Sequence, residues 1–182
     1  NKAFGTNGTV NAGYNIGVYP KYNGGINFNH RNKGINVFGN YNYNNTKQNN
    51  EFNLYRTVLD SVFDGRTKMI FDNISHSFKG GIDFFLNNKH TLGVLINGNL
   101  ANTEFNNNSR TPISYKPTGV VNRILTANNT NDMSRDNVNF NLNYRFADTA
   151  GHELNIDADY GFFHNDGNQL QPNYYYNAAG NT

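Results

Sequence analysis

Apolar and polar residues alternate with a period of two along most of this chain. From Val10 to Val18 the even positions are Val, Ala, Tyr, Ile and Val, whereas the odd positions are asparagine or glycine. This alternation is typical of a β-strand that has one apolar and one polar face. The same pattern predicts six further strands, at residues 22–29, 35–44, 73–84, 90–100, 137–146 and 153–162. We therefore expect an all-β fold in which about seven antiparallel strands follow one another as a meander.

Strand length and the links between strands favour a transmembrane β-barrel. The predicted strands have about nine to twelve residues, close to the roughly 9–11 of a tilted outer-membrane strand and about twice the soluble average. Short links are predicted at Arg31–Lys33, Leu86–Lys89 and Ala147–Gly151, and long loops at Thr46–Lys68, at Thr103–Arg135 and beyond Asn165. Apart from the short first link around Pro20, short and long links alternate, as periplasmic turns and extracellular loops do in such barrels.

The composition resembles at first that of a disordered chain. Asparagine accounts for 39 of the 182 residues, 36% of residues are hydrophobic, 15% are charged, and the mean hydropathy is −0.74. An ordinary soluble domain has roughly 45–50% apolar and 25% charged residues. Disorder does not explain the regular alternation or the aromatic content of 14%, whereas a membrane barrel combines one apolar face with a low average hydropathy.

Several classes of protein are excluded directly. The chain has no cysteine, which rules out disulfides, thiolate zinc sites and thiol catalysis. No apolar run reaches the roughly 18 residues that a transmembrane helix needs. The net charge of +2 arises from scattered basic residues rather than from a basic patch, so no nucleic acid is expected as a partner.

Charged residues within the predicted strands all share the polar register. They are Lys79, Asp83, Arg145, Glu153, Asp157 and Asp159. A lysine or arginine that faces lipid near the midplane costs about 2–4 kcal/mol, so a membrane would exclude charge from the apolar register. The other polar positions are mainly Asn, Gly, Ser and Thr, which suit a hydrated lumen better than the Lys/Glu mixture of a solvated surface. We expect the six charged residues to face a lumen and to contact a plug domain or a substrate, with Arg145 and the three nearby acids in one cluster.

No arrangement of residues predicts catalysis. Ser75 and Ser77 flank His76, but neighbours in a strand point to opposite faces, so they cannot form a nucleophile–base pair. Asp157 and Asp159 share a face about 7 Å apart, yet nothing around them encloses a sugar as a glycosidase requires. We therefore predict that the protein is not an enzyme.

Metal and cofactor sites are not predicted either. The segments Asn131–Asp136 and Asn165–Asn168 are expected to be Asx-rich loops, whose oxygens could bind calcium, although Asx turns explain them without a metal. Four histidines are interpreted as anchors near strand ends, and His164 as a loop residue; the four are His30, His76, His90 and His152. The sequence thus predicts no catalytic, cofactor-binding or metal-binding residues.

The number of strands indicates that the barrel is larger than this chain. An odd number of strands leaves two unpaired edges, which lipid does not tolerate. The tail Gln171–Thr182 could add an eighth strand through its three tyrosines, but Pro172 and residues 177–180 favour a loop. Residues 1–182 are interpreted as a single partial barrel domain, about the first third of the whole.

Five stretches of the sequence carry a resemblance to a known family. They are GYNIGVYPKYNGGINFNHRNKGINVFGNYNYNNT (Gly13–Thr46), FNLYRT (Phe52–Thr57), FFLNNKHTLGVLINGN (Phe84–Asn99), NDMSRDNVNFNLNYRFADTAGHELNIDADYG (Asn131–Gly161) and NDGNQLQPNYYY (Asn165–Tyr176). In this order they resemble the opening barrel strands of TonB-dependent-receptor-like proteins of Bacteroidota, in the outer membrane protein beta-barrel family. In that family a carboxypeptidase-regulatory-like domain and a plug precede a barrel of about 22 strands. The chain matches neither the plug nor the energising box.

The resemblance implies a function in the bacterial outer membrane, either uptake of a bulky nutrient or binding of a partner at the cell surface. The implied partners are outer-membrane lipid and lipopolysaccharide, the plug and the rest of the barrel, a surface lipoprotein and the TonB energising system. Two alternatives stay open. One is a self-contained eight-stranded barrel that acts as an adhesin or anchor, and the other is a soluble Asn-rich β protein that assembles through its unpaired edges.

Overall fold

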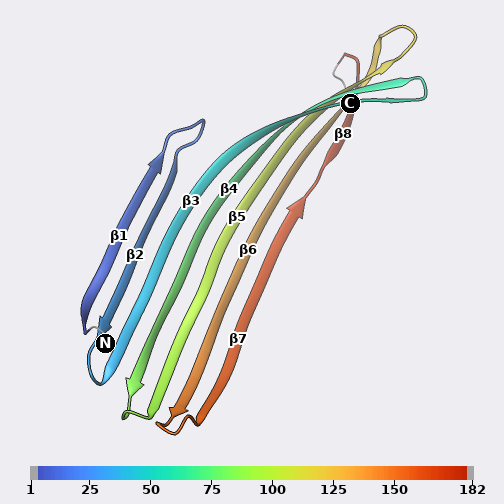
Figure 1. Cartoon of the computed structure of the whole chain (residues 1–182). Coiled ribbons are helices and arrows are strands. Elements are labelled where there is room, and N and C mark those ends of the chain that lie inside the picture. Colours follow the sequence, from blue (N-terminus) through green and yellow to red (C-terminus); the bar gives the residue numbers. More distant parts are fainter. Residues whose placement is uncertain (1–3, 180–182) are drawn as a thin grey trace.

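The computed structural model describes residues 4–179, which form one open antiparallel sheet without a helix. The strands are β1 (Gly5–Asn15), β2 (Lys21–Arg31), β3 (Ile35–Val58), β4 (Ser61–Phe85), β5 (His90–Tyr115), β6 (Val121–Ala147), β7 (Glu153–Leu170) and β8 (Asn173–Asn177). Each strand from β1 to β7 pairs with the next, and β8 pairs with β6 just beyond the end of β7 (Figure 1). The prediction of an all-β antiparallel meander is confirmed.

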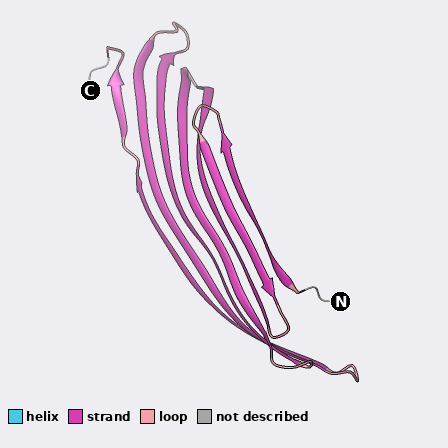
Figure 2. Ribbon diagram, turned by 90° about the vertical axis from the view of Figure 1, so that its left-hand side faces the viewer, coloured by secondary structure: helices cyan, strands magenta, loops and turns pink. Residues whose placement is uncertain are grey.

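The segments predicted as long loops are strands instead. β3 and β4 pair at every residue up to the two-residue turn Leu59-Asp60, and β5 and β6 continue to the link at residues 116–120. These four strands have 24 to 27 residues, so the two hairpins reach far past the β1–β2 hairpin (Figures 1 and 2). The loop prediction was wrong because backbone hydrogen bonds between neighbouring strands form whatever the side-chain pattern. The turn also lacks the usual glycine signal, since Leu59 itself adopts a φ of 52°.

Both ends of the sheet differ from the prediction in detail. β1 begins at Gly5, five residues before the predicted start at Val10. Ile16 and Val18, predicted in the strand, fall in the turn that precedes Pro20, where they are 87% and 77% exposed. Pro20 has no N–H to donate to a ladder, so the hairpin closes before it. The tail contains a strand, β8, because Pro172 sits in the break between β7 and β8, where no ladder bond is needed. Residues 180–182 of the predicted tail lie outside the described range.

The short turns at one end of the sheet share a structural motif, an Asn or Asp side chain that accepts hydrogen bonds from two backbone N–H groups. Asn32 Oδ1 accepts from Gly34 and Ile35 at 2.8 and 2.9 Å. Asn87 Oδ1 accepts from the amides of residues 89 and 90 at 2.9 and 3.0 Å, and Asp148 Oδ1 accepts from those of residues 150 and 152 at 2.9 Å each. This bond fixes a tight Asx turn without help from the rest of the chain. The three predicted short turns are confirmed at residues 32–34, 86–89 and 148–152.

The pairing of the strands places the alternate apolar residues of all seven strands on one side of the sheet, here called the apolar face. Directly paired residues of an antiparallel ladder share a face. One such row crosses six strands: His30, Val37, Ile82, Val94, Leu142 and Ala158. Within residues 6–14, 22–30, 35–43, 74–84, 90–100, 138–146 and 154–162, no Lys, Arg, Asp or Glu lies on this face. The alternate residues form the polar face.

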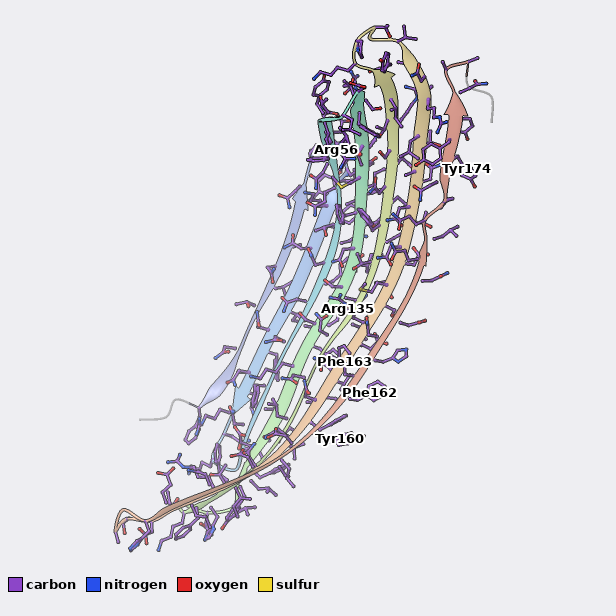
Figure 3. The ribbon with its side chains drawn as sticks, turned by 90° about the vertical axis from the view of Figure 1, so that its right-hand side faces the viewer. Arg56, Arg135, Tyr160, Phe162, Phe163 and Tyr174 are labelled. Carbon is purple, nitrogen blue, oxygen red and sulfur yellow. The ribbon has the colours of Figure 1, made fainter. Side chains whose placement is uncertain are left out.

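The sheet is a single layer and buries no hydrophobic core among the described residues. Side chains project from both faces, including Tyr160 and Phe162 on the free edge strand β7 (Figure 3). On the apolar face Val94 is 47% exposed, Leu142 50% and Ile156 53%. An apolar surface that spans seven strands needs a cover, because soluble domains bury such a face against a second layer.

Past this region neither side of the sheet is uniformly apolar. We call residues 45–73, 101–136 and 163–177 the extension. The side that continues the apolar face there carries charged residues in neighbouring positions, namely Lys47, Asp72, Glu104, Asp132 and Asp166. The opposite side carries apolar ones, among them Phe63, Met69, Phe71, Phe105 and Met133. The apolar face therefore ends at a sharp boundary, although the strands continue.

One glycine on the apolar face gives a test of its packing. A Cβ at Gly98 would lie 2.6 Å from the ring of Phe78 and 2.7 Å from the backbone oxygen of Asn137. Gly98→Val should therefore destabilise the sheet by about 1–3 kcal/mol, because the strand backbone cannot move aside. Gly80 lies on the same face, with its nearest neighbour at 3.9 Å, so Gly80→Val is the matched control and should cost little. Thermal unfolding in detergent would measure both, and equal midpoints would contradict the prediction.

Candidate functional site

All six charged residues singled out from the sequence lie on the polar face. Their cross-strand partners are mostly asparagine: Lys79 pairs with Asn40 and Asn97, Asp83 with Asn36, Asp157 with Asn143, and Asp159 with Asn141. Arg145 and Glu153 lie near the short turn between β6 and β7. The charges are thus spread across the face rather than gathered at one point.

Only part of the predicted charge cluster forms. Arg145 Nε lies 2.9 Å from Glu153 Oε1, and both side chains are about half exposed. Among the described residues no ion pair joins Arg145 to Asp157 or Asp159. The reason is register, since Arg145 pairs directly with Asn155, and the two aspartates lie further along β7.

Asparagine amides link the carboxylates of the polar face into short chains. On β6, Asn143 donates to Asn141 at 3.0 Å, and Asn141 donates to Asp159 at 2.8 Å. Across β2, β3 and β4, Asn29 donates to Asn36 at 3.2 Å, and that amide donates to Asp83 at 3.0 Å. Each amide both donates and accepts, so the chain needs no charge at the intermediate positions. The polar face is consequently a hydrogen-bonding surface with few ionic groups.

Aromatic and histidine side chains border the apolar face at both ends. Near the boundary with the extension, His76 Nδ1 lies 2.6 Å from the Tyr41 hydroxyl, and Tyr14 stacks on Tyr22 at 5.7 Å between ring centroids. Near the short turns, His90 Nδ1 lies 2.6 Å from the Tyr144 hydroxyl. These rings pair an apolar body with a polar tip, a combination that suits an interface between an apolar and an aqueous phase.

The remaining histidines occupy different surroundings. His30 Nδ1 lies 2.7 Å from Thr6 Oγ1 on the edge hairpin, and His152 lies in the turn between β6 and β7. His164, expected in a loop, belongs to β7 and pairs with Asp136. Ser75 and Ser77 face away from His76, because direct neighbours in β4 point to opposite sides of the sheet.

The Asx-rich segments predicted as loops are also strands. Residues 131–136 lie in β6 and residues 165–168 in β7, where Asp132 pairs with Asn168 and Ser134 with Asp166. Within the described part of the chain, no three His, Asp or Glu side chains are arranged to hold a metal ion.

The turn at residues 148–152 contains an acid with a perturbed pKa. The pKa of the Asp148 carboxyl lies below its usual value of 3.8, first because the His152 side chain hydrogen-bonds to it at 2.9 Å, and then because backbone N–H groups donate to it. These bonds favour the ionised form. Asp148 therefore stabilises the turn as a carboxylate.

This turn should loosen in acid. Since the folded pKa of Asp148 is depressed, its contribution to stability is complete above pH 3.8 and is lost as the pH falls through the lower folded value. Protection of the Ala150 and His152 amides against hydrogen exchange would measure the loss. In the Asn87 turn a neutral side chain likewise accepts two backbone N–H groups, from residues 89 and 90, so this turn is the internal control. A parallel loss at both turns would contradict the assignment to Asp148.

Three basic residues lie together at a place that the sequence pattern does not predict. Arg66, Lys68 and Arg110 were assigned to loops, but β4 and β5 place them side by side on one face of the extension. The signal that could have revealed them is the alternation in Arg66, Lys68, Ile70 and Asp72, which runs in register with the predicted strand that follows at residues 73–84.

Comparisons with known proteins assign no family to this chain. The sequence matches no protein-family model and no curated protein. Residues 4–179 contain no helix that could serve as a membrane span.

Proposed function

We propose that this chain is a section of a bacterial outer-membrane β-barrel, with its apolar face against lipid and its polar face lining a hydrated lumen. The observation that carries the proposal is the exposed, charge-free apolar face that seven strands share. Lipid covers such a face without a second protein layer, and the alternation of apolar and polar positions is that of a membrane strand.

The height of the apolar face supports lipid as its cover. From Ile35 to Tyr43 the face spans nine residues of β3, about 27 Å along the strand at roughly 3.4 Å per residue. A strand tilt of about 35–45° reduces this to about 20–22 Å, close to the roughly 25 Å apolar band of outer-membrane barrels. The bordering aromatic rings correspond to the girdles that flank such a band. The short turns would lie on the periplasmic side and the extension outside the cell.

The open edges support a barrel with more strands than these. β1 contacts only β2 among the described elements, and the free edge of β7 faces no partner strand. A closed eight-stranded barrel would require the first and last strands to pair, because lipid tolerates no unpaired edge. This favours a section of a large barrel over the small adhesin-like barrel.

The finer assignment rests on the resemblance to TonB-dependent-receptor-like barrels. We propose that the complete protein admits a bulky nutrient or binds a partner at the cell surface, with a plug against the polar face and the TonB system as the energy source. Lys79, Asp83 and the Arg145–Glu153 pair are then contacts for that plug or for the solute.

Single cysteines test which face meets lipid, since the chain has no native cysteine. Asn139 and Phe140 are adjacent on β6, both are exposed, and they point to opposite faces. In outer membranes a water-soluble maleimide should label Asn139→Cys and leave Phe140→Cys unlabelled. Equal labelling of both cysteines would overturn the proposal and favour the soluble assembly protein.

The mass of the native polypeptide tests the size of the barrel. A product well above 20.5 kDa in the outer-membrane fraction is expected if these strands belong to a large receptor. A product of about 20.5 kDa that migrates faster on gels before heating than after would favour the small barrel instead.

A further inference from the structure

The extension carries an open groove of about 750 Å³ on the side that continues the apolar face. Its lining includes three cations, Arg66, Lys68 and Arg110, and one carboxylate, Glu51. Tyr176 of β8 closes one side of the groove and is half-buried beside Ile124. We call this feature the basic groove.

Lys68 lies directly opposite Glu51 on β3 but, within the described chain, forms no ion pair with it, and the row of the two arginines contains no carboxylate. Arg66 and Arg110 are direct cross-strand partners, and like charges in that position repel each other. The neighbours that extend this row, Asn53 and Thr126, are neutral. Arg66 approaches Asp64 only to 3.9 Å, and among the described residues neither Lys68 nor Arg110 forms an ion pair.

An anion between the two arginines would remove this repulsion. Guanidinium groups bind phosphate or carboxylate through paired, charge-assisted hydrogen bonds. The same groove offers Asn108 and Thr126 for hydroxyl groups and the Tyr176 ring for the apolar face of a sugar. This combination of cations, amides and an aromatic ring fits an anionic saccharide better than a bare ion.

We infer that the basic groove binds the phosphorylated or otherwise acidic saccharide of a glycolipid. This glycolipid would lie in the membrane leaflet nearest to the extension. This inference rests on the proposed function, because it takes the apolar face as the lipid-facing side. The groove lies on the continuation of that face, so a lipid that packs against the sheet has its headgroup on the correct side.

The distance from the apolar face identifies the kind of lipid. Lys68 lies six residues beyond Ile74, where the apolar face ends on β4, about 20 Å along the strand, or about 15 Å above the apolar face after tilt. Headgroups of ordinary phospholipids extend only about 5–8 Å beyond the hydrocarbon. A phospholipid therefore cannot reach the groove, whereas a glycolipid with a chain of several sugars can.

Binding of purified lipopolysaccharide to the complete protein in detergent tests the inference. Arg66→Gln/Arg110→Gln should weaken binding by about tenfold or more, because two charge-assisted contacts are lost. The variant should still fold, since it removes a repulsion. Arg123→Gln/Arg135→Gln makes the same change of charge on the opposite face of the extension and should bind like the parent chain.

Two further probes identify the source of the anion. Phosphatidylglycerol in the same detergent should bind equally weakly to all three proteins, and the saccharide released from the lipopolysaccharide should bind more weakly than the intact glycolipid. The inference is overturned if the Arg66/Arg110 variant binds lipopolysaccharide like the parent chain. It is also overturned if binding of phosphatidylglycerol depends on these arginines in the same way. Binding of the free saccharide without binding of the intact glycolipid would overturn it as well. Cysteine labelling at residues 139 and 140 tests the membrane assignment separately, so the two failures are distinguishable.

Discussion

In the complete barrel, replacing Val94 with arginine should prevent the protein from inserting into a lipid bilayer. Val94 lies near the middle of the apolar face, between Ile82 and Leu142 on the neighbouring strands. An arginine that faces lipid at this depth costs about 2–4 kcal/mol, a large share of the stability of most folded proteins. The fraction of the complete protein that refolds from urea into lipid vesicles, measured by its altered gel mobility before heating, should fall steeply.

The control for this prediction carries the same residue on the other face. Asn139 is exposed on the polar face, and Asn139→Arg should insert nearly as well as the parent chain, because its charge would meet water in the lumen. If Val94→Arg inserts as efficiently as Asn139→Arg, lipid does not cover the apolar face. A sheet in water would tolerate both variants, since Val94 is already 47% exposed.

Removing the two rings that pack in the extension should release its strands from each other without affecting insertion. Phe71 and Phe105 are cross-strand partners on the side opposite the charged residues, and their ring centroids lie 4.5 Å apart. Phe71→Ala/Phe105→Ala should destabilise the extension by about 2–4 kcal/mol, from lost apolar burial and the lost ring contact. Hydrogen exchange of the β4 and β5 amides should accelerate between residues 61 and 73 and between residues 101 and 115.

Phe52 supplies the comparison for this second prediction. It lies on the same side of the extension but is 50% exposed and has no ring partner within the described residues. Phe52→Ala should change exchange rates in the extension little. Faster exchange throughout the sheet in the double variant, including β1 and β2, would show that the extension is not an independent unit of stability.

The strands of the apolar face could be predicted because one side of each has to be free of polar groups. That requirement imposes strict alternation. The alternation shows which residues share a face even in strands that are distant in sequence, such as those around Val10 and Ile156. The extension has no such requirement. Its two sides both mix polar and apolar residues, and Leu59 occupies a turn position where glycine or asparagine is usual. The alternation of apolar and polar residues is therefore weak in the extension, although the strands continue through it.

The charged residues illustrate the same difference. Alternation placed Lys79, Asp83 and Asp159 on the polar face, because it determines the side of the sheet on which a residue lies. It does not determine which residue lies opposite, and so the partner of Arg145 became clear only from the register of β6 and β7. Arg66 and Arg110 are 44 residues apart in the chain, and only the hairpin register brings them together.

The asparagine chains of the polar face have a consequence for any solute that moves along it. Amides do not titrate, so the side chains of Asn36, Asn141 and Asn143 offer the same donors and acceptors in acidic and alkaline surroundings alike. Their attraction for an uncharged, hydroxyl-rich molecule would also change little with salt, because screening acts on charges. A surface of carboxylates would change its preference with the pH and salt of the medium, whereas an amide surface that lined a lumen would select by the number and spacing of hydroxyl and amide groups.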